Sequence, residues 1–475
     1  MSNDQSSNKL NNSQNREDLT AQAYYFSRVE KGLLFSATAI GNLIGTFPVI
    51  VLEQKLATRN LFALFGMISA ISTLLIPWSA SFDYSVLLAM RFIEGFAYAS
   101  VYPVIGTITS QWSLLADSGM YMSLLTCHLQ IGPLITMPLS GALCVSKFGW
   151  PASFYIHGGL TILSVILFYE VYRDSPKIHK FFFSIISFQN LQILIKNFCK
   201  NNTKSKKILY CCYSEYKFFR NVSSKELSKI EKGKNVTYER KMPKVPYNAM
   251  LRDISVWAVW IACIGSTFGF QIFFQYGPVY LNEVLHFEVQ KTGLASALPM
   301  ILSMLVKICF GPFSDHAVCC GQKTRVMLFT FLSQTFMVVC FLFLALIPAD
   351  KAYLGQIAYT TAIASSGLNS VGVIKSGQLV ARQHTHFVMS VISVISCSVI
   401  LILPLLVSIL APDNTMQQWS RIFFVIIGLM IACNMLFFFV GKASEAPWTK
   451  ANSQQIFTTD LSNDNNNNTS TTNKT

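Results

Sequence analysis

Long apolar segments alternate with short polar segments along most of this chain of 475 residues. A stretch of about 20 apolar residues is long enough, at about 1.5 Å per residue, to cross a bilayer core of about 30 Å as a helix. About eleven stretches near this length are present, at residues 31–52, 61–80, 84–110, 120–145, 152–172, 254–280, 292–313, 325–348, 353–374, 386–410 and 420–441. The pattern predicts an all-α polytopic protein, integral to a membrane and multi-pass.

The segments outside these stretches have a different composition. Residues 1–30 and 442–475 are polar and rich in Asn, Ser and Thr, so we expect both to be disordered. Residues 173–252 form a basic linker between two groups of predicted helices. The first group occupies residues 31–172 with five helices, and the second occupies residues 253–441 with six.

The distribution of charge indicates the orientation of the chain. The net charge is +14, from 37 Lys and Arg against 23 Asp and Glu, and residues 173–252 alone hold 18 basic and 5 acidic residues. A nucleic-acid-binding protein places such charge on a folded reading module. Here it interrupts membrane segments, so we expect no nucleic-acid partner. Because cytoplasmic loops are enriched in Lys and Arg, we expect the linker and the C-terminal tail to be cytoplasmic and the N-terminus to be extracytoplasmic.

The linker itself admits more than one interpretation. Residues 181–198 are apolar but contain Gln189 and Lys196, which favours an interfacial amphipathic helix over a further span. Residues 178–219 have a low-complexity composition of Phe, Ile, Lys and Asn. A non-native insert, such as a retained intron or a mispredicted exon, is an equal alternative for that stretch.

The two groups of helices share one spacing of marker residues. An acidic residue follows a Gly-Leu pair by 21 residues at Glu53 and by 22 residues at Asp315, and Met-Ser pairs precede Pro138 by 16 residues and Pro404 by 15. Two halves with the same helix order, joined by a long cytoplasmic linker, are typical of the major facilitator fold. The second half has a helix at 254–280 with no counterpart in the first. The expected first helix is therefore missing, either because the gene model is truncated or because this is a natural eleven-helix variant.

Several short motifs resemble one branch of that fold. Arg91-Phe92-Ile93-Glu94-Gly95 followed by Tyr102-Pro103, Gly149-Trp150-Pro151, and the ending Glu445-Ala446-Pro447-Trp448 are similar to solute carrier family 17, the anion:cation symporters. The resemblance runs from about residue 26 to 448 without 178–219. It implies a secondary active transporter that moves an organic anion or phosphate across a lipid bilayer. It also implies an ion gradient of H⁺ or Na⁺, or the membrane potential, as the driving force.

Three residues of one predicted helix are the leading candidates for the transport path. Arg91, Glu94 and Tyr98 are spaced i, i+3 and i+7, so they share a helical face. Counted from Asp83 at the membrane edge, Arg91 lies about 12 Å deep and Glu94 about 16 Å deep, where an isolated charge is costly. The resemblance implies that Arg91 acts in anion transport. We expect Arg91 to attract the anion and Glu94 to change its protonation or pairing, and the alternative is a permanent structural pair.

Other polar residues in the predicted helices have less specific roles. Lys307 is expected either to reach the cytoplasmic surface beside Asp315 or to contact substrate. The fold resemblance implies that a second polar group lines the central cavity, namely Gln271, Gln275, Tyr276 and Asn369. Two further pairs resemble the loop motif that connects helices at the cytoplasmic side of major facilitators, namely Glu53 with Arg59 and Asp315 with Arg325.

No enzymatic motif accompanies these features. GxSxG, Walker A and HExxH are absent from the sequence, and its twelve cysteines form no CxxC pair. We therefore expect no catalytic residue, no metal site and no cofactor, and a monomeric transporter with a small anionic substrate. A non-transporting membrane receptor or scaffold, or an inactive truncated transporter, is the alternative.

Overall fold

The structure is a computed structural model that describes residues 28–113, 118–176, 228, 245–285, 289–316, 321–347 and 351–449. Within these ranges the chain is helical and has no β-strand. The helices of the first half are α2 (Arg28–Glu53), α3 (Thr58–Phe82), α4 (Tyr84–Tyr98), α5 (Val101–Trp112), α6 (Ser118–Thr126), α7 (His128–Val145) and α8 (Gly149–Val171). The helices that follow the linker are α12 (Tyr247–Arg252), α13 (Ile254–Val279), α14 (Val289–His316), α15 (Gln322–Leu346), α16 (Ala352–Ser366), α17 (Val373–Ala381), α18 (Thr385–Leu410) and α19 (Met416–Val440).

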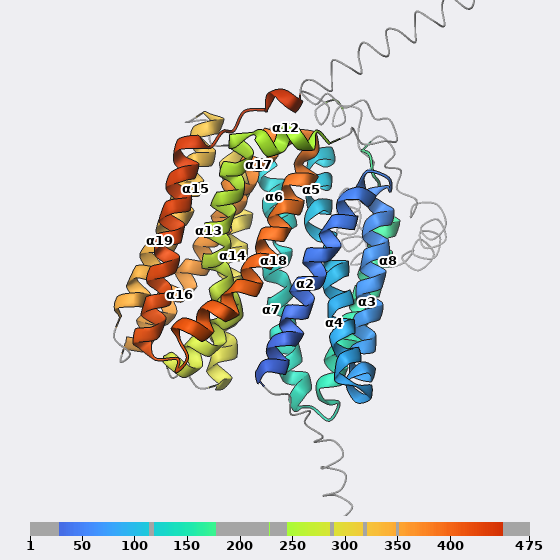
Figure 1. The fold of residues 1–475 in the computed structure, drawn as a ribbon, viewed down its shortest axis with the longest axis vertical. Helices are drawn as coiled ribbons and strands as arrows, with labels where there is room; N and C mark the ends of the chain where they lie inside the picture. The colour runs from blue at the N-terminus through green and yellow to red at the C-terminus, as the bar shows by residue number, and fades with distance from the viewer. Residues whose placement is uncertain are drawn as a thin grey trace, which may run out of the picture.

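These helices form two bundles that stand side by side (Figure 1). Between them, α14 packs against α6 and α7, and α18 packs against α2 and α5. The short helix α12 lies across one end, which we call the linker end because α2 stops there and α18 begins there. The opposite end contains Asp83, whose carboxylate accepts a hydrogen bond from the backbone N–H of Ser85 at 2.9 Å and caps α4. Hydrogen bonds from Ser85 lower the pKa of that carboxyl below its usual value.

The predicted all-α membrane architecture is confirmed. In the described part of the chain, 9 helical segments are long and apolar enough to cross a membrane. One of them spans 59 residues, Ala352–Leu410, and contains α16, α17 and α18. The segment made of α4 and α5 is not among the nine, because the helix breaks between them and neither part is long enough alone. The number of eleven spans therefore stays a prediction.

The interruption between α4 and α5 corrects the continuous helix expected over 84–110. Helix α4 ends at Tyr98 and α5 begins at Val101. Pro103 explains the break, because it has no N–H to donate to the carbonyl of Ala99 and its ring collides with that carbonyl. The N–H of Ser100 instead reaches the carbonyl of Ala97, three residues back, at 3.5 Å.

A second interruption, at Cys127, divides the helix expected over 120–145 into α6 and α7. Side chains at this point bond to the backbone of the preceding turn. The Thr126 hydroxyl donates to the carbonyl of Met122 at 2.7 Å, and the Cys127 thiol donates to the carbonyl of Ser123 at 3.1 Å. Such bonds compete with the regular helical pattern and favour a local bend.

The chain ends of the described region also differ from expectation. Helix α2 begins at Arg28, three residues before the first predicted span. Residues 442–449, assigned to a disordered tail, pack against the linker end: Trp448 Nε1 donates to Asp253 Oδ2 at 2.9 Å, and Ala446 is buried. The remaining tail, most of residues 1–30 and the stretches 181–198 and 178–219 lie outside the described residues.

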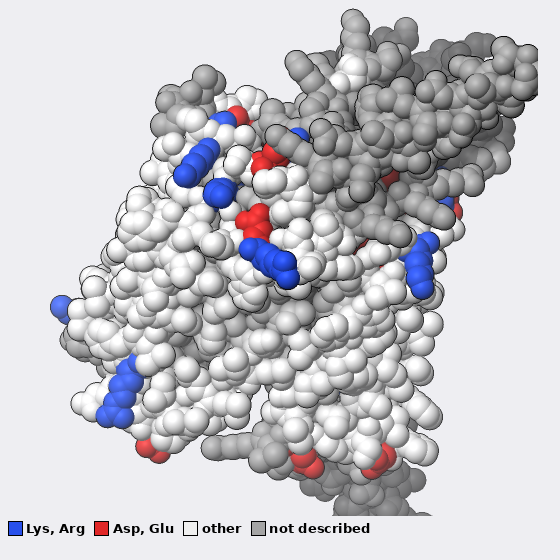
Figure 2. All heavy atoms as spheres, turned by 45° about the horizontal axis from the view of Figure 1, so that its top comes forward, with Lys and Arg blue, Asp and Glu red and all other residues white. Residues whose placement is uncertain are grey.

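Charged side chains gather towards the two ends of the molecule. In the view of Figure 2, Lys, Arg, Asp and Glu cluster near the ends, and a broad region between them is white. Large apolar side chains are exposed along the long helices, for example Leu167 on α8 and Phe343 on α15. An apolar surface of this extent matches a lipid environment, because apolar side chains exposed along a spanning helix contact hydrocarbon rather than water.

Candidate functional site

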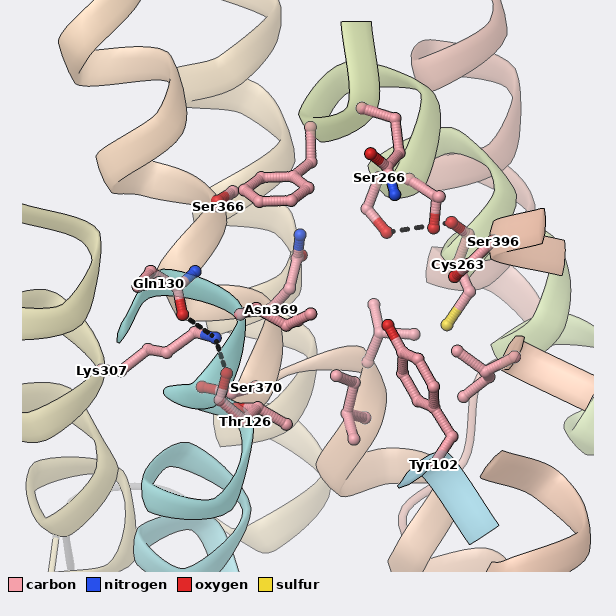
Figure 3. A pocket seen from close by; sticks show the side chains of 17 residues that line it. Tyr102, Thr126, Gln130, Cys263, Ser266, Lys307, Ser366, Asn369, Ser370 and Ser396 are labelled. Atoms are coloured by element: carbon pink, nitrogen blue, oxygen red, sulfur yellow. Dashed lines mark hydrogen bonds between the residues drawn. The ribbon is translucent and has the colours of Figure 1, made fainter. Parts of the chain in front are cut away.

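A cavity of about 100 Å³ lies between the two bundles (Figure 3). Both halves contribute to its wall, which consists of α5, α6, α7, α13, α14, α17, α18, the end of α16 and the turn that follows it. Its polar lining residues are Tyr102, Thr126, Gln130, Ser266, Thr267, Gln271, Lys307, Ser366, Asn369, Ser370 and Ser396. Space at the junction of two repeats, lined by polar groups inside an apolar body, is typical of a substrate site in transporters of this architecture.

Among the described residues that line the cavity, Lys307 is the one that carries a charge. It lies on α14, nine residues before the end of that helix at His316, which places it about 14 Å from the linker end. Its side chain is 5% exposed. The ammonium Nζ donates to the backbone carbonyl of Thr126 and to Oε1 of Gln130, both at 2.9 Å. Lys307 thus crosses from the second half to the break between α6 and α7 in the first half, and it does not reach the surface beside Asp315.

Neutral polar groups surround this lysine. Gln130 Nε2 donates to Ser303 Oγ at 3.3 Å, and Asn369 Oδ1 accepts from Gln334 Nε2 at 3.4 Å. The hydroxyls of Ser123 and Ser370 share a hydrogen bond of 2.9 Å that joins the two halves. Figure 3 shows Lys307 and Gln130 on one wall and Ser266, Cys263 and Ser396 on the opposite wall.

The candidates on α4 lie outside this cavity. Arg91 and Glu94 form the expected ion pair at 3.0 Å, with side chains 30% and 24% exposed. The Arg91 guanidinium also stacks over the ring of Phe154, 5.1 Å from its centre, and the Thr73 hydroxyl donates to Glu94 at 3.3 Å. Tyr98 ends the helix and is exposed. The structure therefore joins Arg91 to Glu94 but does not bring either of them to the cavity residues.

The second group of candidates divides in two. Gln271 and Asn369 line the cavity, and Oε1 of Gln271 is buried without a hydrogen-bond partner in the described part of the chain. Gln275 and Tyr276 follow Gln271 by one turn of α13 and are not among the lining residues. Tyr276 packs against Trp419 instead, with ring centres 6.4 Å apart.

The linker end is closed by a buried carboxylate that bonds to both halves. Asp315, at the end of α14, pairs with Lys375 at 2.5 Å, and their side chains are 0% and 2% exposed. The same carboxylate accepts hydrogen bonds from the backbone N–H groups of Gly119 at 3.1 Å and Met120 at 2.7 Å, in the first turn of α6. A Cβ at Gly119 would lie 2.7 Å from Asp315 Oδ1, so this approach requires glycine. We call this set of contacts the Asp315 latch.

The latch differs from the pairs expected from sequence. Arg325 donates to the backbone carbonyls of Ser314 and Asp315, at 3.0 and 2.9 Å, rather than to the carboxylate. Lys375 follows the predicted span 353–374 by one residue, where the basic residues of a cytoplasmic loop are expected, but it is buried on α17. The sequence does contain a signal for this burial. A lysine that follows an apolar stretch by one residue can be the buried partner of an acid as well as a loop residue.

The expected pair of Glu53 and Arg59 does not form. Arg59 Nε donates to the carbonyl of Tyr169 at 2.6 Å and its guanidinium lies 3.8 Å from the centre of that ring, so it joins α3 to α8. Glu53 is buried and accepts a hydrogen bond from the Thr107 hydroxyl. It also interacts electrostatically with His386, in the first turn of α18. Glu53 at the end of α2 therefore corresponds to Asp315 at the end of α14. Each is a buried acid near the linker end, Glu53 towards α18 and Asp315 towards α6.

Sequence comparison adds three findings to this geometry. A family model described as Major Facilitator Superfamily matches residues 17–360. Mouse sodium-dependent phosphate transport protein 1 is 23% identical over 430 residues, which cover 90% of this chain and 83% of that protein. Sheep sialin is 22% identical over 438 residues, which cover 92% of this chain and 80% of that protein. These relatives confirm the predicted resemblance to solute carrier family 17, at low identity.

Structural comparison agrees with the family match. The solved structure of the proton:xylose symporter XylE, bound to 6-bromo-6-deoxy-D-glucose, has a TM-score of 0.62 over 90% of each chain at 11% identity. At that identity the likeness concerns the fold alone. Since the family model covers most of the chain and the fold agrees with it, the chain belongs to the Major Facilitator Superfamily, as an integral membrane transporter related to sialin and the sodium-dependent phosphate transport proteins.

Proposed function

We propose that the protein is a secondary active transporter that moves a small organic anion or phosphate by alternating access. In this proposal the two bundles rock around the central cavity, and an ion gradient of H⁺ or Na⁺, or the membrane potential, drives net movement. The linker end faces the cytoplasm, in keeping with its basic loops. The Asp315 latch then holds the cytoplasmic side closed.

The observation that supports this proposal most is the position of the cavity. It lies between the halves, and residues from both halves form its wall. At the linker end the halves contact each other through Asp315 with Gly119 and Met120. A site placed between two bodies that are joined at one end is what alternating access requires. The relationship to sodium-dependent phosphate transport protein 1 favours phosphate or another anion as the cargo.

The Arg91–Glu94 pair has a proposed role in the same cycle. Its side chains are partly exposed, so the pair is accessible to water or to an ion on the transport path. Protonation of Glu94 would remove the negative charge that pairs with Arg91. The Arg91 guanidinium would then be free to bind an anion. Coupling of transport to protons would follow from that exchange of partners.

Flux through the purified full-length protein in liposomes tests the proposal. We expect uptake of labelled inorganic phosphate or of a labelled carboxylate such as gluconate, with a dependence on an imposed pH gradient, sodium gradient or membrane potential. Liposomes without protein are the control for leakage. Absence of uptake for every anion and every gradient would reject the transporter in favour of the receptor or scaffold alternative.

A further inference from the structure

We propose that Lys307 is the anion-binding residue of the central cavity, and that the anion replaces a contact that holds the two halves together. This inference rests on the proposed transport function and names the residue that recognises the charge of the transported anion. The ligand chemistry is a carboxylate or phosphate group. Three observations carry the proposal: the missing counter-charge of Lys307, its free hydrogen-bonding capacity, and its position across the interface between the halves.

Lys307 has no carboxylate partner among the described residues. The ion pairs found there join Arg91 to Glu94, Lys375 to Asp315, and Arg382 to Glu445. Lys375, which is as deeply buried as Lys307, has its acid at 2.5 Å. Burial of an unpaired ammonium is costly, and in the described part of the chain Lys307 offsets this cost with two neutral oxygens. An anion in the cavity would supply the missing charge.

The ammonium has bonding capacity left for a ligand. A lysine carries three N–H donors, and among the residues that the structure describes Lys307 uses two of them, on Thr126 and Gln130. The third donor is available in the cavity that Lys307 lines. The side-chain amide of Asn369 also lines the cavity and can contribute a neutral hydrogen bond to the same anion.

The present contacts of Lys307 connect binding to movement. Thr126 is the last residue of α6, where the free carbonyls of a helix end attract a cation. Lys307 therefore joins α14 of one half to the end of α6 in the other. An anion that draws the ammonium away from the Thr126 carbonyl weakens this connection between the halves. Arg91, by contrast, already has the carboxylate of Glu94 at 3.0 Å, so it offers less free charge in this state.

Thermal unfolding of the purified full-length protein measures the binding step without any transport. We expect sodium phosphate or sodium gluconate to raise Tm above the value in sodium chloride of equal ionic strength, because a ligand that binds the folded state stabilises it. The anion that gives the larger shift identifies the source of the charge. The Lys307→Gln variant keeps a donor for Thr126 but removes the charge. We expect its apparent Kd to rise roughly ten- to hundredfold, as for the loss of a hydrogen bond to a charged group.

Two further variants separate binding from folding. Lys351→Gln removes one exposed cation at the opposite end and should bind anions as the wild type does. Asn369→Asp places an isosteric carboxylate in the cavity, where it competes with the anion for Lys307, so anion affinity should fall at least tenfold even if Lys307→Gln does not fold.

The possible outcomes distinguish this inference from the proposed function. If wild-type protein transports an anion and both Lys307→Gln and Asn369→Asp keep its KM and its Tm shift, the assignment to Lys307 is wrong and transport stands. If Lys307→Gln cannot be purified, unchanged affinity in Asn369→Asp alone overturns the assignment. If the wild type neither binds nor transports any anion of the panel, the proposed function fails as well.

Discussion

Neutralisation of Asp315 should open the linker end of the molecule. Its carboxylate accepts two backbone hydrogen bonds from α6, at 3.1 and 2.7 Å, and pairs with Lys375 within its own half. A hydrogen bond to a charged group contributes about 1.5–3 kcal/mol and a neutral one about half of that. Asp315→Asn therefore weakens the contact between the halves by about 2 kcal/mol, or roughly 30-fold in an equilibrium constant.

Hydrogen–deuterium exchange measures this change where it occurs. The first N–H groups of a helix have no partner within the helix, so those of Gly119 and Met120 depend on Asp315 for protection. We expect Asp315→Asn to speed exchange in residues 118–126 by roughly 30-fold. If the latch controls the whole linker end, the first turn of α18, which contains His386, exchanges faster too.

A matched variant and a clear negative result complete this test. Glu445→Gln removes another acid at the linker end, from a partly exposed ion pair with Arg382 at 2.9 Å; exposed pairs contribute about 0–1 kcal/mol. Exchange in residues 118–126 should not change in that variant. If Asp315→Asn also leaves this segment within twofold of the wild type, the latch does not hold the two halves together.

Three other substitutions test separate parts of the structure. Arg91→Ala should abolish anion flux in liposomes at normal expression while the anion-induced Tm shift of the purified protein persists, and unchanged flux would reject a role for the Arg91–Glu94 pair. Gly95→Ala should cost about 1–3 kcal/mol of stability by overpacking, because its Cβ would lie 1.9 Å from the carbonyl of Thr38, whereas Gly159→Ala meets nothing within 4 Å; equal Tm values for the two variants would contradict this. Trp448→Phe removes the hydrogen bond to Asp253 and should lower stability by about 1–3 kcal/mol, so an unchanged Tm would show that the segment 442–449 does not contribute to the fold.

The sequence predicted the spans well because their signal is local. A run of about 20 apolar residues is recognisable without any knowledge of neighbours, and the repeated spacing around Glu53 and Asp315 indicated two related halves. The breaks were missed for a physical reason. Around Cys127, small polar side chains bond to the preceding turn while the composition stays apolar, so the segment still has the composition of a continuous span.

The candidate site was predicted less well, because its partners are distant in sequence. Lys375 lies 60 residues from Asp315, and Lys307 lies 177 residues from Gln130. Residue spacing on one helix predicted the Arg91–Glu94 pair, which is local. Spacing along one helix could not show that Lys307 points across the interface between the halves rather than towards the membrane surface. The position of a charged residue along a helix gives its depth in the membrane, but only tertiary packing determines which neighbouring helix its side chain contacts.

The interruptions at Ala99–Ser100 and at Cys127 divide the linker end of the first half from the rest of that half. Beyond these points, α5 and α6 are short segments of 12 and 9 residues. A helix bends most easily where its hydrogen-bond ladder is broken, so both segments can pivot without moving α4 and α7. In the proposed alternating access, α5 and α6 would therefore move as two short segments, each with a hinge beside the residues that line the cavity. Because α6 packs against α14 and α5 packs against α18, displacement of these two segments would be enough to open or close the linker end in that proposal, while the long helices keep their contacts with lipid.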